Sequence, residues 1–215
     1  MQNRQPESFI AVSEALNFTA HAQYRKWLRK SRIRARDALS PEERAEKSAR
    51  TVERITQSEA FQKAKTVLIY AHVRAELSLE QLVSHPMSAE KRFAYPLCIS
   101  DSEMAAMIPS GSGARRPGAF GIPEPVPELS LPVMPEELDL VICPCAAFDC
   151  ACNRMGMGAG YYDRYLPKCV NAVICAVAFE AQKAERVPAE EWDRPMDMVF
   201  TEKEVYVREK KADRL

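Results

Sequence analysis

Apolar and polar residues alternate along the chain in blocks that predict helices and strands in turn. Residues 25–38 and 41–56 are predicted helices, and Ser40, Pro41 and Glu43 form a typical start for the second. Short apolar runs rich in branched residues predict buried strands, with a short helix beginning at 79–83. The predicted strands are 67–73, 92–98, 104–108, 138–143, 172–179 and 198–201.

Nearly continuous apolar strands separated by helices are typical of a mostly parallel sheet that is covered on both faces. We therefore predict an α/β fold, a single-domain three-layer α/β/α sandwich with a Rossmann-like sheet. Ligands of such sheets bind beyond the carboxyl ends of the strands. The segment that follows the apolar run 138–144 is predicted to lie at such an end.

Residues 109–135 are rich in Pro and Gly and predict a long irregular connection. Arg115 and Arg116 precede Phe120 there, and an aromatic ring beside paired arginines suits a flat heteroaromatic ligand with acidic groups. The alternative is a surface loop whose Phe120 fills the core.

Three of the seven glycines, Gly156, Gly158 and Gly160, occur within five residues, between a predicted strand and a predicted helix. Glycines let backbone N–H groups approach an anion, and the helix N-terminus adds its positive dipole end. Arg154 can bind a phosphate with two hydrogen bonds, and Asp163 carries a carboxylate of the kind that Mg²⁺ prefers. These residues predict a nucleotide-phosphate loop, although a structural turn uses the same glycines and neither standard phosphate-loop spacing is present.

Composition predicts a compact cytoplasmic protein. The 215 residues suit one domain, and 30 basic against 30 acidic residues favour neither nucleic acid nor an anionic membrane. We find no apolar run of membrane-spanning length and no leader pattern, and we expect the seven cysteines to be reduced.

Two local patterns leave alternatives open. Residues 25–36 hold seven Lys or Arg and no acid, which indicates a solvated helix face or an RNA or lipid surface. Cys143-x-Cys145 and Cys150-x-Cys152 invite a zinc site, but one intervening residue is fewer than structural zinc sites use. Small buried hydrophobic residues are the simpler interpretation of these thiols.

Five segments, taken in order and spacing, resemble the 5-formyltetrahydrofolate cyclo-ligase family, whose members are also called 5,10-methenyltetrahydrofolate synthetases. The resemblance covers residues 24–207, which form the expected cyclo-ligase-like domain. Residues 1–23 are then an N-terminal extension of uncertain order, with at most a short helix at 10–16, and residues 208–215 form a charged tail. The segments are 25–29 with 39–43, 73–78, 120–125, 138–166 and 187–202.

The resemblance implies an ATP- and Mg²⁺-dependent ligase that closes 5-formyltetrahydrofolate to 5,10-methenyltetrahydrofolate and releases ADP and phosphate. The formyl oxygen would receive the γ-phosphoryl group of ATP, and N10 would then attack and displace phosphate. A monomer acting on ATP and a reduced folate, polyglutamylated or not, is expected. The alternatives are a ligase for another folate or pterin and a non-catalytic relative that binds nucleotide or folate.

The resemblance also assigns roles to residues. Catalytic roles fall to Arg154 and Tyr161. The expected ATP-binding residues are Arg25, where family members typically carry Lys, and Lys26, Arg29, Arg154, Met155, Gly156, Met157, Gly158, Ala159, Gly160, Tyr161 and Tyr162. The expected folate-binding residues are Glu76, Arg116, Phe120, Phe148, Met157, Gly158, Ala159, Gly160 and Tyr161. Asp163 and Asp197 are the expected Mg²⁺ ligands, which requires the fold to bring them together, and Asp149 is expected to cap a turn.

Overall fold

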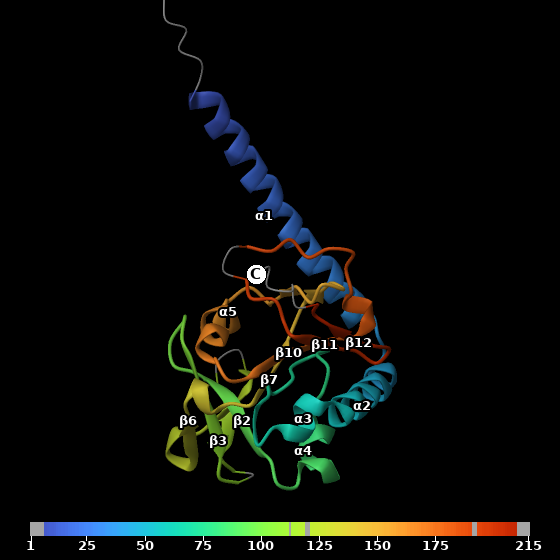
Figure 1. The fold of residues 1–215 in the computed structure, drawn as a ribbon, viewed down its shortest axis with the longest axis vertical. Coiled ribbons are helices and arrows are strands. Elements are labelled where there is room, and N and C mark those ends of the chain that lie inside the picture. Colours follow the sequence, from blue (N-terminus) through green and yellow to red (C-terminus); the bar gives the residue numbers. More distant parts are fainter. Residues whose placement is uncertain (1–6, 112, 119–120, 191–192, 210–215) are drawn as a thin grey trace, which may run out of the picture.

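A mixed eight-stranded sheet forms the centre of the protein (Figure 1). The computed structural model describes residues 7–111, 113–118, 121–190 and 193–209. The strand order is β12-β11-β10-β7-β1-β2-β3-β6. The strands are β1 (Thr66–Leu68), β2 (Arg92–Cys98), β3 (Met104–Pro109), β6 (Ser130–Val133), β7 (Leu140–Pro144), β10 (Val173–Val177), β11 (Met198–Phe200) and β12 (Val205–Val207).

The five central strands β2, β1, β7, β10 and β11 are parallel, whereas β12 pairs antiparallel with β11 on one side, and on the other β3 pairs antiparallel with both β2 and β6. Val67 of β1 lies between Phe93 of β2 and Leu140 of β7, and Val141 lies opposite Ile174 of β10. The predicted mostly parallel sheet is confirmed, with antiparallel edges that the sequence did not reveal.

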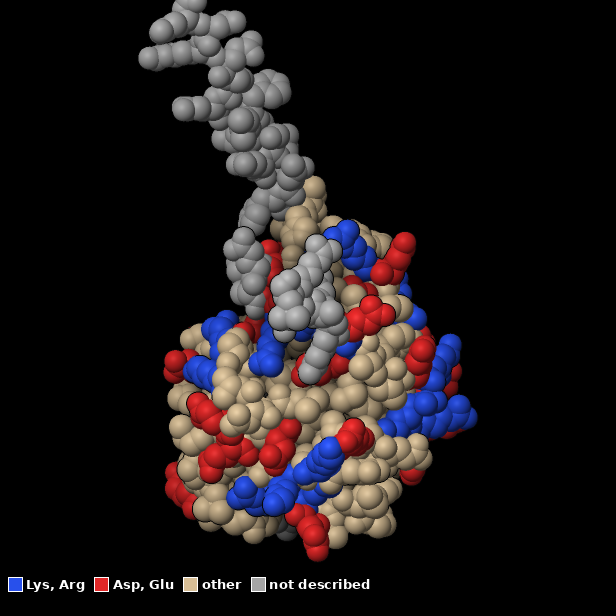
Figure 2. Space-filling model, viewed as in Figure 1, with Lys and Arg blue, Asp and Glu red and all other residues tan. Residues whose placement is uncertain are grey.

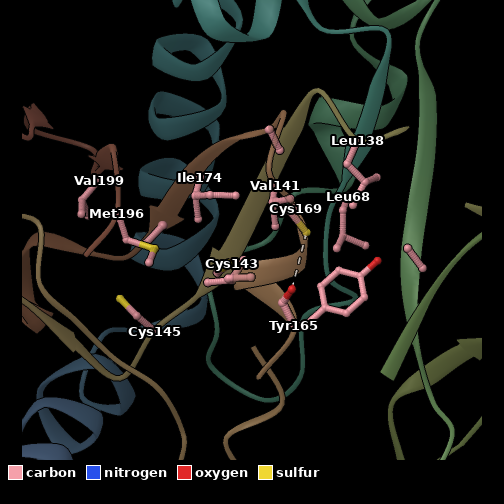
Figure 3. Close-up of a cluster of buried hydrophobic side chains, with 14 of the residues drawn as sticks. Leu68, Leu138, Val141, Cys143, Cys145, Tyr165, Cys169, Ile174, Met196 and Val199 are labelled. Atoms are coloured by element: carbon pink, nitrogen blue, oxygen red, sulfur yellow. Dashed lines mark hydrogen bonds between the residues drawn. The ribbon is translucent and has the colours of Figure 1, made fainter. Parts of the chain in front are cut away.

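Helices cover both faces of the sheet, as the three-layer prediction requires. Along β7, Leu140 and Ile142 pack in the cluster with α2, α3 and α4, whereas Val141 and Cys143 pack in the cluster with α5, which Figure 3 shows. This alternation follows from the two-residue period of a strand. The helices on the two faces are α2 (Pro41–Gln57), α3 (Glu59–Lys63), α4 (Glu80–Ser84) and α5 (Tyr161–Tyr165). The described part of the chain also contains the 3-10 helices η1 (Pro86–Ser88), η3 (Pro127–Leu129), η4 (Pro135–Glu137), η5 (Leu166–Lys168) and η6 (Glu180–Gln182).

The N-terminal helix α1 (Glu7–Asp37) is a single helix of 31 residues. The sequence predicts a helix that begins at residue 25 and a separate short helix at 10–16. The structure joins the two into one helix, so the predicted start at 25 and the predicted break before it are wrong. The reason is that 7–37 contains neither Gly nor Pro, the two strongest helix breakers. The first part of α1 extends away from the body, and the later part packs on it through Leu28 (Figure 1).

The start of α2 is confirmed at atomic detail. The amide of Glu43 donates to Ser40 Oγ at 3.2 Å, and the amide of Ser40 donates to Glu43 Oε2 at 2.8 Å. This reciprocal capping box satisfies two N–H groups that would otherwise lack partners, and Pro41 occupies the first turn.

The predicted irregular connection 109–135 is wrong in part, because it contains β4 (Arg115–Pro117), β5 (Pro123–Pro125) and β6. Pro132 of β6 lies opposite Met107 at the edge of the sheet, where a residue without an N–H group is tolerated. The predicted strand 67–73 is also shorter: β1 ends at Leu68, and Arg74 adopts a left-handed conformation with φ +55°.

Basic and acidic side chains are interspersed over the face of the molecule that Figure 2 shows. Within the described ranges, no helix combines the length and apolar character that crossing a membrane requires.

Candidate functional site

The glycine loop, residues 156–160, follows β7 through a small hairpin of β8 (Ala147–Phe148) and β9 (Arg154–Met155). Gly158 has φ +119° and Gly160, which precedes α5, has φ +72°. Residues with a Cβ atom rarely adopt these angles, so the shape of the loop depends on both glycines. The loop lies beyond the carboxyl end of β7, where the sequence predicts it.

Asp149 fixes the hairpin that leads to the loop. Its Oδ1 accepts the amides of Ala151 and Asn153, both at 3.0 Å, and its Oδ2 accepts the amide of Val187 at 2.8 Å. The predicted turn-capping role is confirmed.

Arg154 lies beneath the glycine loop. Its side chain is 3% exposed, Nη1 donates to Pro144 O at 3.0 Å, and Nη2 donates to Asp163 Oδ1 at 2.5 Å. A Cβ atom on Gly156 would lie 3.3 Å from Nη1, so the loop passes directly over the guanidinium. The predicted direct phosphate contact is therefore not what this geometry provides. Arg154 instead ties the end of β7 to α5 and supports the loop.

Arg29 reaches the loop from α1. Its Nε donates to Gly156 O at 2.9 Å, and a Cβ atom on Gly158 would lie 3.9 Å from its guanidinium. No described residue accepts a hydrogen bond from its two terminal nitrogens. Burial and the neighbouring charge of Arg25 lower the pKa of Arg29, which indicates a crowded positive site. This guanidinium is in place to bind an anion above the loop.

Arg25, one turn earlier on α1, is more fully engaged. Its Nη1 donates to Asp193 Oδ2 at 2.8 Å and to Pro188 O, and its Nε lies 3.5 Å from Glu190 Oε1. An anion at Arg25 would have to share it with these acceptors. The neighbouring Lys26 is exposed.

Asp163 and Asp193 are both close enough to Arg29 to affect its charge. Asp163 accepts from Arg154, and Asp193 accepts from Arg25 and from the amide of Glu190 at 2.9 Å. Both carboxylates raise the pKa of Arg29 and so oppose the effect of burial. The sequence did not single out Asp193 as a ligand, although it lies in the last segment of the family resemblance.

Asp197 lies elsewhere. Its Oδ2 accepts the amide of Ile174 at 2.9 Å, near the beginning of β10. Pro144, which anchors Arg154, lies opposite Val177 at the other end of that strand. Three residues of strand separate the two levels by about 10 Å. The expected convergence of Asp163 and Asp197 is therefore not seen, because Asp197 stands at the amino end of β10 and Asp163 beyond the carboxyl end of β7.

Glu76 follows the end of β1 in a turn stabilised by its own side chain. Its Oε2 accepts the amide of Val73 at 3.1 Å, and the side chain is 11% exposed. Burial raises the pKa of Glu76, while the Val73 amide and Arg36 oppose this increase. The nearby hydroxyl of Tyr70 donates to Leu77 O at 2.5 Å.

Two tyrosines begin α5. The hydroxyl of Tyr161 donates to Ser100 O at 2.9 Å, and its ring lies under Arg164, with Cζ 5.7 Å from the ring centroid. The Tyr162 hydroxyl is buried without a hydrogen-bond partner among the described residues, and burial raises its pKa well above the ordinary value. Met157 and Ala159 of the loop are exposed.

Two of the expected ligand contacts conflict with burial. Phe148 has no exposed surface and packs against Tyr206 with ring centroids 5.3 Å apart, so its side chain is part of the core and offers no surface for the predicted folate contact. The side chain of Met155 is equally buried, which leaves only its backbone for ATP. Arg116 is exposed on β4, with Nη2 3.9 Å from Glu128 Oε2, and Phe120 lies outside the described residues.

The thiols of the two Cys-x-Cys pairs differ in their exposure. Cys143 and Cys145 are buried, and burial raises the pKa of each to about 12, whereas Cys150 is exposed. Among the residues that the structure describes, no three His, Cys, Asp or Glu side chains are arranged to hold a metal ion.

A cavity of about 810 Å³ lies at the amino ends of β1 and β2, away from the glycine loop. Its size does not make it the ligand site, because none of the residues discussed above lines it. The lining residues are Gln62, Lys63, Ala64, Lys65, Pro86, Met87, Ala89, Glu90, Lys91 and Arg92.

Comparison with known proteins gives one consistent result. Residues 21–202 match the 5-formyltetrahydrofolate cyclo-ligase family. The mouse 5-formyltetrahydrofolate cyclo-ligase is 28% identical over 190 residues, covering 80% of this chain and 89% of the mouse protein. The *Escherichia coli* K12 enzyme of the same name is 28% identical over 175 residues, covering 80% of this chain and 96% of that protein.

Solved structures agree. The *Aquifex aeolicus* 5,10-methenyltetrahydrofolate synthetase has a TM-score of 0.75 and 32% identity, covering 88% of this chain and 97% of that one. The *Mycoplasma pneumoniae* 5,10-methenyltetrahydrofolate synthetase, at 22% identity and a TM-score of 0.68 over 83% of this chain and 98% of that one, shares the fold.

Proposed function

Because the chain belongs to the 5-formyltetrahydrofolate cyclo-ligase family and is a ligase, we propose that it converts 5-formyltetrahydrofolate and ATP into 5,10-methenyltetrahydrofolate, ADP and phosphate. One observation supports this proposal above the others: Arg29 of α1 is anchored to the carbonyl of Gly156 and keeps its two terminal nitrogens toward a loop shaped by glycine. Such a loop and guanidinium suit a polyphosphate.

The phosphates of ATP would lie between the backbone of the glycine loop and Arg29. Arg25 would contribute charge from the next turn of α1, while its ion pair with Asp193 holds that carboxylate near the site. Arg154 would act indirectly by keeping the loop and Asp163 in position. Most of the catalytic effect in phosphoryl transfer comes from such positioning and from charge stabilisation.

Asp163 and Asp193 fit Mg²⁺ better than the expected pair. Each carboxylate is held through one oxygen, and no described donor bonds to Oδ2 of Asp163 or Oδ1 of Asp193. Mg²⁺ commonly takes one or two carboxylates together with phosphate oxygens and water, so two free oxygens beside a phosphate loop suffice. The ion would neutralise charge that develops on the transferred phosphoryl group.

The folate would lie between the loop and Glu76, with Met157, Ala159 and Tyr161 on the loop side. A formamide oxygen is a poor leaving group, and phosphorylation would make it a good one. Attack by N10 on the formyl carbon would then close the ring, with loss of the N10 proton and release of the oxygen as phosphate. No covalent bond to the protein is needed in this sequence. We further expect a monomer in the cytoplasm.

The test is incubation of the purified protein with 5-formyltetrahydrofolate, ATP and Mg²⁺, with methenyl-folate absorbance and ADP followed together. We expect the two products in equal amounts and none when either substrate is omitted. Arg29→Met should reduce use of ATP sharply. Arg34→Met is the matched control, because Arg34 is exposed on the same helix. ADP release that is independent of folate, or cyclisation without ATP, would contradict the proposal.

A further inference from the structure

Arg36, in the last turn of α1, is a buried charge that the reaction described above does not use. The residue is 5% exposed, and its Nε donates to Asp37 Oδ1 at 2.9 Å. Its Nη1 is buried without a hydrogen-bond partner among the described residues and lies 3.9 Å from Glu76 Oε1. A buried guanidinium is costly unless charge and hydrogen bonds compensate it, so a position with one unsatisfied nitrogen requires an explanation.

The surroundings of Glu76 show which charge matters to it. Tyr162 of α5, Cys145 after β7 and Tyr70 after β1 face it as neutral groups. The cationic groups near it are Arg74 of its own turn and Arg36 of α1, and His72 of the same turn adds a positive charge only when it is protonated.

Of these cationic groups, Arg36 is the most deeply buried. Arg74 is exposed, and His72 is half-buried and lies 3.9 Å from Glu80. Solvent screens exposed charges more strongly than buried ones. Of the three basic groups, Arg36 therefore lowers the pKa of Glu76 the most.

The length of the contact is informative. At 3.9 Å, Arg36 and Glu76 attract each other without a direct hydrogen bond. A bidentate pair at 2.8 Å would occupy the carboxylate oxygens. Here Oε2 accepts one backbone amide, and Oε1 keeps its capacity to accept hydrogen bonds from a bound molecule.

We propose that Arg36 is a positioning residue that keeps Glu76 ionised and oriented, so that this carboxylate accepts hydrogen bonds from the N–H groups of a heteroaromatic ligand. That the ligand is a folate rests on the proposed function. A protonated Glu76 would lose acceptor capacity and gain a donor, and it would then repel the same N–H groups.

The direct test measures the ionisation of Glu76 in the ligand-free protein by carboxyl ¹³C NMR titration, with the signal assigned by its absence in Glu76→Gln. In Arg36→Met the midpoint should rise by about one pH unit relative to wild type, because a cation within ~4–6 Å lowers a carboxyl pKa by one unit or more. Arg36→Lys should stay close to wild type. An equal midpoint in wild type and folded Arg36→Met would overturn the proposal. If Arg36→Met does not fold, Arg36→Gln gives the same comparison.

A second measurement separates positioning from general structure. For Arg36→Met, the KM for 5-formyltetrahydrofolate should increase more at pH 5.5 than at pH 8, by up to about tenfold for one unit of pKa shift, with kcat little changed. A loss of kcat and KM that is uniform across pH would indicate a merely structural role and would overturn the proposal. A wild-type protein without turnover would refute the proposed function alone, since the titration does not depend on the substrate.

Discussion

The amino ends and the carboxyl ends of the parallel strands both gather charged side chains, but they use them differently. At the amino ends, Asp139 Oδ2 accepts the amides of Lys65 at 2.9 Å and Thr66 at 2.8 Å, and Asp197 accepts the amide of Ile174. These carboxylates cap strand starts. At the carboxyl ends, Arg29 and Glu76 are each held by one backbone bond and keep further hydrogen-bonding capacity.

This difference distinguishes charged groups that stabilise the fold from charged groups available to a ligand, and it does so better than cavity size. The 810 Å³ cavity lies at the amino ends, where the nearby carboxylate of Asp139 is satisfied by the backbone. The carboxyl ends contain partly buried charged groups, Arg29 and Glu76, that are positioned but incompletely satisfied. Groups of this kind are costly to a fold and are typical of ligand sites.

The largest effect should come from removing the best-satisfied charge at the carboxyl ends. Arg154→Met leaves Asp163 and Pro144 O without their donor, and we expect the free energy of unfolding to fall by about 3 kcal/mol. Breaking a buried ion pair costs about 3–5 kcal/mol, and the low end of that range applies because Asp163 is one quarter exposed. Arg92→Met at the amino ends, where an exposed Arg92 donates to Thr66 Oγ1, should cost less than about 1 kcal/mol. Urea unfolding measures both values. Equal losses would remove the contrast between the two ends.

A smaller but more specific effect is expected in the glycine loop. Gly158→Val forces a branched residue to φ +119°, at about 1–3 kcal/mol of local strain, and removes the close approach of the backbone to an anion. We expect the KM for ATP to rise at least about tenfold, whereas the strain lowers the melting temperature by about 2–4 °C per kcal/mol and leaves the protein folded in the assay. Gly111→Val is the control, since Gly111 has open space around it and no positive φ. Unchanged ATP kinetics in Gly158→Val would make the loop a structural turn.

The smallest effect is expected in the Mg²⁺ dependence of activity, which distinguishes aspartates that bind the ion from aspartates that stabilise the fold. Asp163→Asn and Asp193→Asn should each raise the Mg²⁺ concentration that gives half-maximal activity, by several-fold, because Mg²⁺ prefers charged oxygen ligands. Asp197→Asn should leave this concentration unchanged and alter only the melting temperature, since its carboxylate binds a strand amide. Activity titrated with Mg²⁺ and thermal unfolding give the two readouts. A shifted Mg²⁺ dependence in both Asp163→Asn and Asp197→Asn, but not in Asp193→Asn, would restore the pair that the sequence predicts.

Much of the fold could be predicted because its strands are buried on both faces and therefore read as apolar runs, as in β7 and β10. Short strands and edge strands have weaker sequence patterns. β8 and β9 have two residues each, too few to show the alternation of a strand, and Pro132 makes the β6 segment resemble a loop.

Within the site, the glycine loop could be predicted because its chemistry is local to a few adjacent residues. The choice between Asp193 and Asp197 could not, because it depends on where the chain enters β11. Arg36 and Glu76 are forty residues apart in the sequence, and their approach depends on how α1 packs against the turn after β1. Neither segment alone contains a pattern that predicts this contact.

The continuity of α1 sets a fixed spacing between two chemical tasks. Arg29 and Arg36 belong to one uninterrupted helix and lie about two turns, or roughly 10 Å, apart on nearly the same side. The helix therefore fixes the distance between the proposed nucleotide site and the carboxylate of Glu76. An added residue between these two arginines would rotate one relative to the other by about 100°, so this segment should tolerate substitution far better than insertion or deletion.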